Sequence, residues 1–191
     1  MANYTVPYGQ LVDERLWGSV PMLRWMGDAA RTLRLVSRPL FDHYADAGNT
    51  TTGETTLYSD SLFPGQLLTN GDKITATYVV TYAANANTKR TRVYFAGTAI
   101  LDTTALTRNN AAAQDRIDVT VIRESATVVR CVASILAHNG SGTLVVNPST
   151  YTRITSLTLS DAQILKLTGQ SSSATNDIVA KMGAVSYTPA A

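Results

Sequence analysis

Two histidines, one cysteine and a few carboxylates are the side chains of this sequence that could carry out acid–base or nucleophilic chemistry. His43 lies in the segment Leu-Phe-Asp-His-Tyr, and His138 begins a loop rich in Gly and Ser. A Ser-His-Asp hydrolase needs one of these imidazoles next to an activated serine, and neither is accompanied by a nucleophile-elbow pattern. The histidines and the cysteine lack the spacing of a zinc site, and no Gly-rich phosphate loop is present. We therefore expect no catalytic residue, no metal and no cofactor.

Carboxylates are a second source of chemistry, because a pair of them can cleave a glycosidic bond. The candidates are Asp102, Asp115, Asp118 and Glu124. The last three lie among arginines in the sequence. We therefore interpret those three as partners in surface ion pairs.

Loops that contain Asn and Asp offer the oxygen ligands that Ca²⁺ prefers. The candidate pairs are Asn70 and Asp72, Asn85 and Asn87, and Asn176 and Asp177. Tight turns favour the same residue types, because their side chains hydrogen-bond to nearby backbone groups. We favour the turn interpretation for all three pairs.

Cys131 is the single cysteine, which excludes an intrachain disulfide. It lies in a run of β-favouring residues, where it shares side-chain parity with Val129, Ala133 and Ile135 because strand side chains alternate between faces. We expect a buried small hydrophobic residue, since apolar surroundings raise the pKa of a thiol and suppress its reactivity.

The overall composition is that of a globular chain with a nearly neutral surface. Of the 191 residues, 45% are hydrophobic and 16% are charged, and the net charge is +2. No dense block of Lys or Arg occurs, so we expect no nucleic-acid partner. The N-terminal residues lack the pattern of a signal peptide, and no apolar run is long enough to cross a bilayer. These features predict no membrane association and assembly in a cytoplasm.

The sequence changes character near residue 60. The first third contains both tryptophans and three of the four methionines, whereas the remainder is rich in Thr, Ala and Val. A globular enzyme rarely divides in this way, but an anchoring arm joined to a β-domain does. We predict an N-terminal arm over residues 1–45, a Gly/Thr-rich connector over 46–60 and a β head over 61–191.

The arm is predicted to contain one amphipathic helix over about residues 20–37. Ser19 can cap this helix, Pro21 is tolerated in its first turn, and apolar residues then recur at steps of three and four. Pro39 disfavours helical backbone at the residue before it. Packing of the helix on its own domain stays open as an alternative, whereas a membrane-surface helix is disfavoured because Asp28 interrupts the basic face.

The other interpretation of the arm is an anchor that buries aromatic and methionine side chains in a groove of a partner protein, where these types are favoured. The extended residues 1–18 would dock as well, because such a terminal segment cannot bury its apolar groups alone. The candidate anchor residues are Tyr4, Tyr8, Trp17, Met22, Arg24, Trp25, Met26, Arg31 and Arg34.

The β part has an apolar periodicity of two. In its first long strand the side chains that share one face are Ile74, Ala76, Tyr78, Val80 and Tyr82. Further strands are predicted over residues 89–95, 99–102, 117–124, 128–137, 143–146, 151–159, 165–168 and 178–187. Short strands at near-regular spacing predict an antiparallel β-sandwich or jelly roll. An up-and-down barrel is the rival, because periodicity does not distinguish the two.

Four turn-like motifs occur in order along the β part. They are Leu-Thr-Asn-Gly-Asp-Lys-Ile at 68–74, Asn-Ala-Asn-Thr-Lys at 85–89, Phe-Ala-Gly-Thr at 95–98, and Thr-Gly-Gln at 168–170 followed by Ala-Thr-Asn-Asp-Ile at 174–178. In this order and spacing, about residues 57–187 resemble the jelly-roll virion structural proteins of tailed bacteriophages. Those proteins are found as capsid decoration proteins and as tail-fibre or receptor-binding heads. Ala96 departs from the pattern, since similar proteins often have Gly there, and the resemblance does not cover the N-terminal third.

The resemblance implies a non-enzymatic structural protein located in the virion, for which a homotrimer is a common state. We expect a capsid decoration or cement protein that binds the major capsid protein through its N-terminal arm. The alternative is a tail-fibre or receptor-binding head that recognises a host glycan or surface protein. A glycan-cleaving enzyme that uses Asp102 or Asp118 is a third hypothesis.

Overall fold

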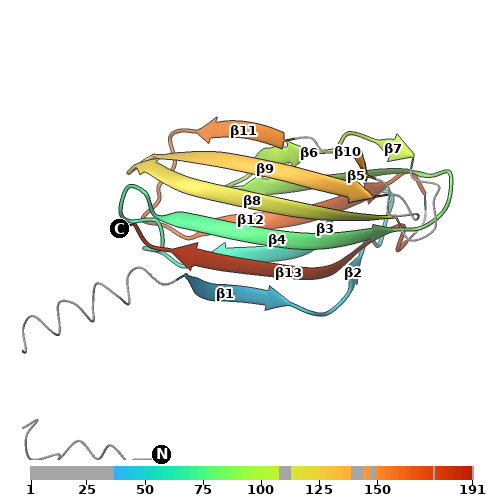
Figure 1. Cartoon of the computed structure of the whole chain (residues 1–191), viewed down its shortest axis with the longest axis horizontal. Helices are drawn as coiled ribbons and strands as arrows, with labels where there is room; N and C mark the ends of the chain where they lie inside the picture. The colour runs from blue at the N-terminus through green and yellow to red at the C-terminus, as the bar shows by residue number, and fades with distance from the viewer. Residues whose placement is uncertain (1–36, 108–112, 139–143, 147–148, 174, 191) are drawn as a thin grey trace, which may run out of the picture. The chain divides into compact units, whose positions relative to one another are not determined.

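Strands with one apolar face pair into two antiparallel sheets that enclose a common core (Figure 1). The computed structural model describes residues 37–107, 113–138, 144–146, 149–173 and 175–190. The arm up to residue 36, and with it nearly all of the helix predicted at about 20–37, lies outside the described residues. Residues 37–190 make up one compact unit.

The described residues form thirteen strands in the two sheets. Sheet A contains β1 (Arg38–His43), β2 (Ala47–Gly48), β4 (Lys73–Tyr82), β8 (Gln114–Ser125), β9 (Val128–His138), β10 (Leu144–Val146), β11 (Ser149–Ile154) and β13 (Ile178–Thr188). Sheet B contains β3 (Thr55–Leu62), β5 (Thr88–Phe95), β6 (Thr98–Asp102), β7 (Leu106–Thr107) and β12 (Gln163–Ser171).

The strand order places elements from distant parts of the chain side by side. Sheet A runs β1-β13-β4-β8-β9-β10, with β11 on β9 and β2 on β13, and sheet B runs β3-β12-β5-β6, with β7 on β5. Every pairing is antiparallel. The prediction of a mainly β, antiparallel sandwich is therefore confirmed. The barrel alternative is wrong, because the strands form two separate sheets.

The core lies between the sheets and is built from the alternating faces that the sequence predicts. All five side chains of the first predicted face, from Ile74 to Tyr82, are at most 6% exposed. Val93, Phe95 and Leu165 face them from sheet B and are completely buried. Burial of each large apolar side chain contributes about 1.5–3 kcal/mol, so this core is a major source of the stability of the sandwich.

The sandwich begins further toward the N-terminus than residue 61. Residues 38–60, which the sequence assigns to the end of the arm and to the connector, carry β1, β2 and most of β3. Asn49 explains part of the difference, because its Oδ1 accepts a hydrogen bond of 2.9 Å from the backbone N–H of Ile178. The Gly/Thr-rich segment is therefore held on β13 by a contact between residues far apart in the sequence. Threonine is also common in strands, so its abundance does not by itself mark a linker.

Candidate functional site

The nine predicted anchor residues between Tyr4 and Arg34 all lie outside the described residues. The structure consequently neither brings them together nor separates them. A candidate binding surface has to be built from the sandwich, where sequence reasoning placed no anchor.

One edge of the sandwich carries the end strands of both sheets. β1 pairs only with β13 among the described strands, and β3 pairs only with β12. The two edge strands are linked by a hydrogen bond of 2.7 Å between His43 Nε2 and Asp60 Oδ1. Edge strands present unpaired backbone groups that can bind another chain, so this edge is a natural docking surface.

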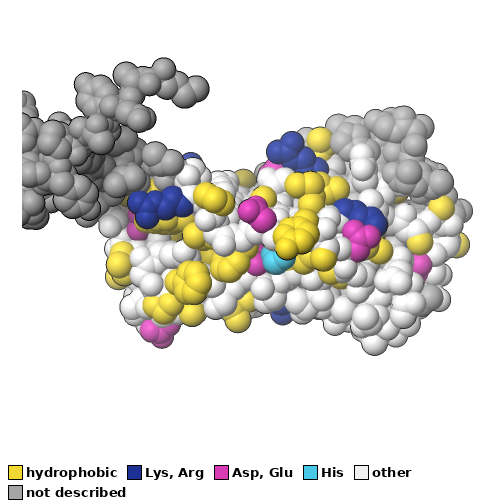
Figure 2. Space-filling model, turned by 90° about the horizontal axis from the view of Figure 1, so that it is seen from below, with side chains coloured by type: hydrophobic (Ala, Val, Ile, Leu, Met, Phe, Trp, Pro, Cys, Tyr) yellow, Lys and Arg dark blue, Asp and Glu magenta, His cyan; other side chains and the backbone are white. Residues whose placement is uncertain are grey.

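Large apolar side chains gather on this edge, as Figure 2 shows from the side on which β1 lies. We call them the edge patch, which consists of Leu40, Phe41, Tyr44, Phe63 and Met182. Tyr44 is 92% exposed, Phe63 64% and Met182 47%. Phe41 stacks on Phe63 with their ring centroids 6.4 Å apart. Clusters of exposed aromatic and methionine side chains are typical of protein-binding surfaces.

Sequence reasoning missed the edge patch, although local signals for it exist. Tyr44 comes directly after the last residue of β1, and Phe63 directly after the last residue of β3, before Pro64. Aromatic residues just beyond the end of a strand have no cross-strand partner to cover them. Which strand ends lie at an edge depends on the pairing of β1 with β13, and that pairing is not visible in the local sequence.

Beneath the edge patch, the contact between His43 and Asp60 links β1 to β3. Asp60 is 2% exposed, and burial raises the pKa of its carboxyl, an effect that the hydrogen bond and charge of His43 oppose. The imidazole of His43 stacks on the ring of Tyr58, with centroids 4.2 Å apart. The hydrogen bonds of the described residues connect no serine or threonine hydroxyl to His43. The arrangement positions the edge strand that carries the patch.

Three of the four candidate carboxylates are held by arginines. Asp118 pairs with Arg116, and Glu124 bridges Arg130 and Arg153. Asp102 pairs with Arg90 and Arg92 on the outer face of sheet B. The interpretation as surface ion pairs is confirmed for Asp118 and Glu124.

The surface position expected for Asp115 is wrong, because this side chain is completely buried. Its Oδ2 accepts a hydrogen bond of 2.6 Å from the hydroxyl of Tyr82. Asp115 lies on β8, where it pairs with Val80 of β4, and strand parity turns its side chain into the core. A buried carboxylate needs such a donor, because leaving it unsatisfied would cost free energy.

Acid is expected to weaken the sandwich in the range where Asp102 titrates. The hydrogen bond from Arg90 lowers the pKa of Asp102 from 3.8 to about 2. Because this folded-state pKa lies below the unfolded value, the carboxylate adds stability above pH 3.8 that is lost as the pH falls toward 2. The contribution is small, since the pair is partly exposed to solvent. Asp102→Asn should reduce the pH dependence of the free energy of unfolding in this range, measured by urea denaturation at several pH values. Asp161→Asn, in an exposed loop, is the control. If the free energy of unfolding falls equally with pH in the Asp102 variant and the native chain, this assignment is contradicted.

The Asn and Asp side chains of the loops are satisfied by protein donors. Asp177 accepts hydrogen bonds from Asn85 Nδ2 at 2.7 Å, Asn87 Nδ2 at 2.7 Å and Ser171 Oγ at 2.6 Å. Asp72 accepts from the backbone N–H of Thr69 at 2.6 Å. These contacts support the turn interpretation. Among the described residues, no group of three or more His, Cys, Asp or Glu side chains is placed to hold a metal ion.

Cys131 has the buried position that its strand parity predicts. It is completely buried in β9, and burial raises the pKa of its thiol to about 12. We expect no reaction with a thiol reagent such as dithionitrobenzoate at neutral pH in the folded state, and stoichiometric reaction after unfolding in urea. Labelling of the folded chain at the rate of the unfolded chain would show that the thiol is exposed.

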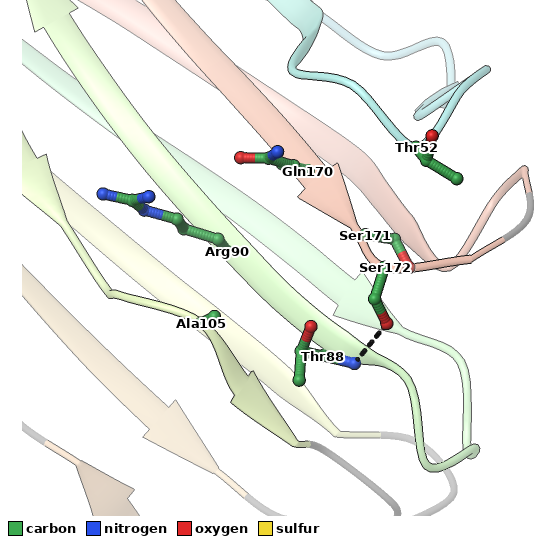
Figure 3. A pocket seen from close by; sticks show the side chains of 7 residues that line it. All are labelled: Thr52, Thr88, Arg90, Ala105, Gln170, Ser171 and Ser172. Carbon is green, nitrogen blue, oxygen red and sulfur yellow. Dashed lines mark hydrogen bonds between the residues drawn. The ribbon is translucent and has the colours of Figure 1, made fainter.

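A polar pocket of about 260 Å³ lies at one end of sheet B (Figure 3). It is lined by Thr52, Thr88, Arg90, Ala105, Gln170, Ser171 and Ser172. Figure 3 shows the side chain of Arg90 pointing away from Ser171 and Ser172, and the backbone N–H of Thr88 donates to Ser172 Oγ at 2.9 Å. No aromatic residue is among the described residues that line it, so the pocket lacks the stacking platform that many sugar sites use.

Comparisons with known proteins do not assign the chain to a family. No protein-family model matches the chain, and no curated protein matches it. Within the part of the chain that the structure describes, no helix has the length and apolar character needed to cross a membrane.

Proposed function

We propose that this chain is a non-enzymatic structural protein of a bacteriophage virion, and that it decorates the capsid by binding the major capsid protein. The observation that carries the proposal is the edge patch. Its exposed aromatic and methionine side chains lie on and beside β1, the strand that directly follows the aromatic- and Met-rich residues 1–36. In the arm, Arg24, Arg31 and Arg34 would pair with acidic groups of the shell.

The proposal includes a jelly roll, which is the fold that the resemblance implies. The strand order supports it, because the chain passes repeatedly from one sheet to the other and places β1-β13-β4-β8 opposite β3-β12-β5-β6. A jelly roll has two four-stranded sheets formed by two Greek keys. The strands β9, β10 and β11 would then be an extension of sheet A inserted before β12.

A homotrimer completes the proposal. The outer face of sheet A carries small and β-branched side chains, among them Thr75, Thr120 and Val132, beside the ion pairs Arg116–Asp118 and Glu124–Arg130. Small side chains allow another copy to approach closely, and the charges of this face are already paired within the chain. Three arms held together would raise the effective concentration of each arm at its site, so modest affinity of a single arm suffices.

Paired substitution of the edge patch tests the proposal. Tyr44→Ser with Phe63→Ser should lower the affinity for particles that lack this protein by about 100-fold, because each side chain forfeits about 1.5 kcal/mol or more of burial. The measurement is co-sedimentation with such particles over a concentration series. Unfolding should be little changed, since both side chains are more than half exposed.

Tyr151→Ser is the matched control for this experiment. Tyr151 is 60% exposed, but it lies on β11, which pairs with β9 near the edge of sheet A opposite to β1. Retained particle binding by the patch variant, or an equal loss in the control, would refute a specific role for the edge patch.

The alternative is a tail-fibre or receptor-binding head, and the polar pocket at the end of sheet B is the observation that favours it. Hydroxyl groups and the Gln170 amide could bind a host glycan through hydrogen bonds. Binding of residues 37–191 to host cells, lost on Gln170→Ala together with Thr88→Val, would support this function over capsid decoration.

A further inference from the structure

A second pocket, of about 300 Å³, lies where the turn between β8 and β9 meets the loops 63–72 and 155–162. Its apolar lining includes Leu67, Leu68, Leu157 and Leu159. Leu67 and Leu159 are each 3% exposed, whereas Leu68 is 59% exposed. The backbone N–H of Leu157 donates to the carbonyl of Thr127 at 3.0 Å, which ties one loop to the turn. The pocket therefore has a fixed aliphatic lining and an accessible leucine.

One charged side chain, Arg123, lines this pocket. Its Nε donates to the carbonyl oxygen of Ser125 at 3.0 Å. Its Nη1 is buried and has no hydrogen-bond acceptor among the described residues. Because Nη1 is buried and Nε already has an acceptor, an acceptor from outside the chain would meet the guanidinium at Nη2.

Two carboxylates near Arg123 in the chain or in its backbone contacts are bound to other donors. Asp72 contacts Arg123 only through the backbone, and its carboxylate accepts hydrogen bonds from Thr69, Tyr187 and Ala190. Glu124 is paired with arginines of β9 and β11. Arg90, Arg92, Arg116, Arg130 and Arg153 each have a carboxylate within 4.0 Å, but no such pair is found for Arg123 in the described residues. The pocket thus combines an aliphatic lining with a positive charge that no described carboxylate neutralises.

We propose that this pocket binds an aliphatic carboxylate of about the size of one amino-acid residue. The accessible part of the guanidinium supplies a positive charge and an N–H donor for a carboxylate, and the leucines match an aliphatic side chain. A volume of about 300 Å³ lies at the lower end of the range for small-ligand sites, which limits the ligand to one residue or a short acid. The carboxylate comes either from a free acid or from the C-terminal residue of a polypeptide. The proposal does not depend on whether the chain is a virion protein.

Titration of the full chain with three small probes tests the proposal, with ¹H–¹⁵N NMR of the Arg123 side chain and the Thr127 amide as the readout. N-acetyl-leucine represents a C-terminal residue, 4-methylpentanoate represents a free acid, and N-acetyl-leucinamide lacks the carboxylate. We expect saturable shifts with at least one acid at a dissociation constant on the order of 1 mM, and binding of the amide about tenfold weaker or absent. Tighter binding of N-acetyl-leucine than of 4-methylpentanoate identifies a polypeptide end as the source, and the reverse order identifies a free acid.

Two variants and a control complete the test. Arg123→Gln should weaken the acid about tenfold or more by removing the charge. Leu68→Asp should weaken it through repulsion, and it is expected to fold because Leu68 is mostly exposed. Tyr151→Asp places the same charge on an exposed residue that does not line the pocket and should leave binding unchanged. Absence of saturable shifts with either acid, or equal binding of the amide, would overturn the proposal. Unchanged affinity in the Leu68 variant would overturn it as well.

Discussion

Removal of residues 1–36 is expected to abolish binding to particles while leaving a folded β-sandwich. The deletion removes all nine candidate anchor residues and keeps β1, which begins at Arg38. Each well-buried large side chain of the arm would contribute about 1.5–3 kcal/mol at the shell, so loss of the six aromatic and methionine anchors lowers the affinity beyond detection. The measurement is occupancy on particles that lack the native protein, determined by co-sedimentation and gel densitometry.

The design of this truncation follows from the structure. A deletion through residue 45 would also remove β1, which pairs with β13 and contributes His43 to the contact with Asp60. Loss of binding in that longer deletion could then reflect damage to the sandwich. The control is the thermal unfolding of residues 37–191, which should remain cooperative. A truncated chain that still decorates particles at native occupancy would contradict the role of the arm.

Asp177→Ala is expected to destabilise the sandwich by about 3–5 kcal/mol, because it removes a buried carboxylate and leaves its donors without a partner. Asp177 is 3% exposed and accepts hydrogen bonds from Asn85, Asn87 and Ser171. Burial raises the pKa of this carboxyl, but the hydrogen bonds lower it by more, so the net shift of the pKa is downward. The loss corresponds to a fall in melting temperature of roughly 6–20 °C, at about 2–4 °C for each kcal/mol.

Asp46→Ala is the matched control for the loss at Asp177. Asp46 is paired with Lys181, but its side chain is 59% exposed, and such surface pairs contribute about 0–1 kcal/mol. The measurement is the melting temperature of both variants and of the native chain, determined by calorimetry at neutral pH. Equal melting temperatures for Asp177→Ala and the native chain would show that the cluster does not hold the loops around it.

The sequence predicts those parts of the fold that depend on local alternation. The face that runs from Ile74 to Tyr82, the burial of Cys131 and most strand positions follow from a periodicity of two, and the structure confirms them. The turn roles of Asp72 and Asp177 follow equally from residue type, because short carboxylates bind nearby backbone and amide groups. These features need no knowledge of which strands are neighbours.

Features that depend on long-range pairing were not predictable in the same way. Asp115 looks like a surface residue among charged neighbours, yet the hydroxyl that satisfies it belongs to Tyr82 on another strand. Asn49 looks like part of a linker, yet its partner is Ile178. The edge patch exists because the topology leaves β1 and β3 at the same edge, and the pocket beside Arg123 is formed by three separate loops. Sequence position alone does not reveal such contacts.

The copy number of this protein relative to the major shell protein, measured by quantitative mass spectrometry of purified particles, tests the central claim most directly. Capsid decoration predicts a copy number within a small factor of that of the shell protein. A copy number lower by more than an order of magnitude would contradict capsid decoration and place the chain in the tail.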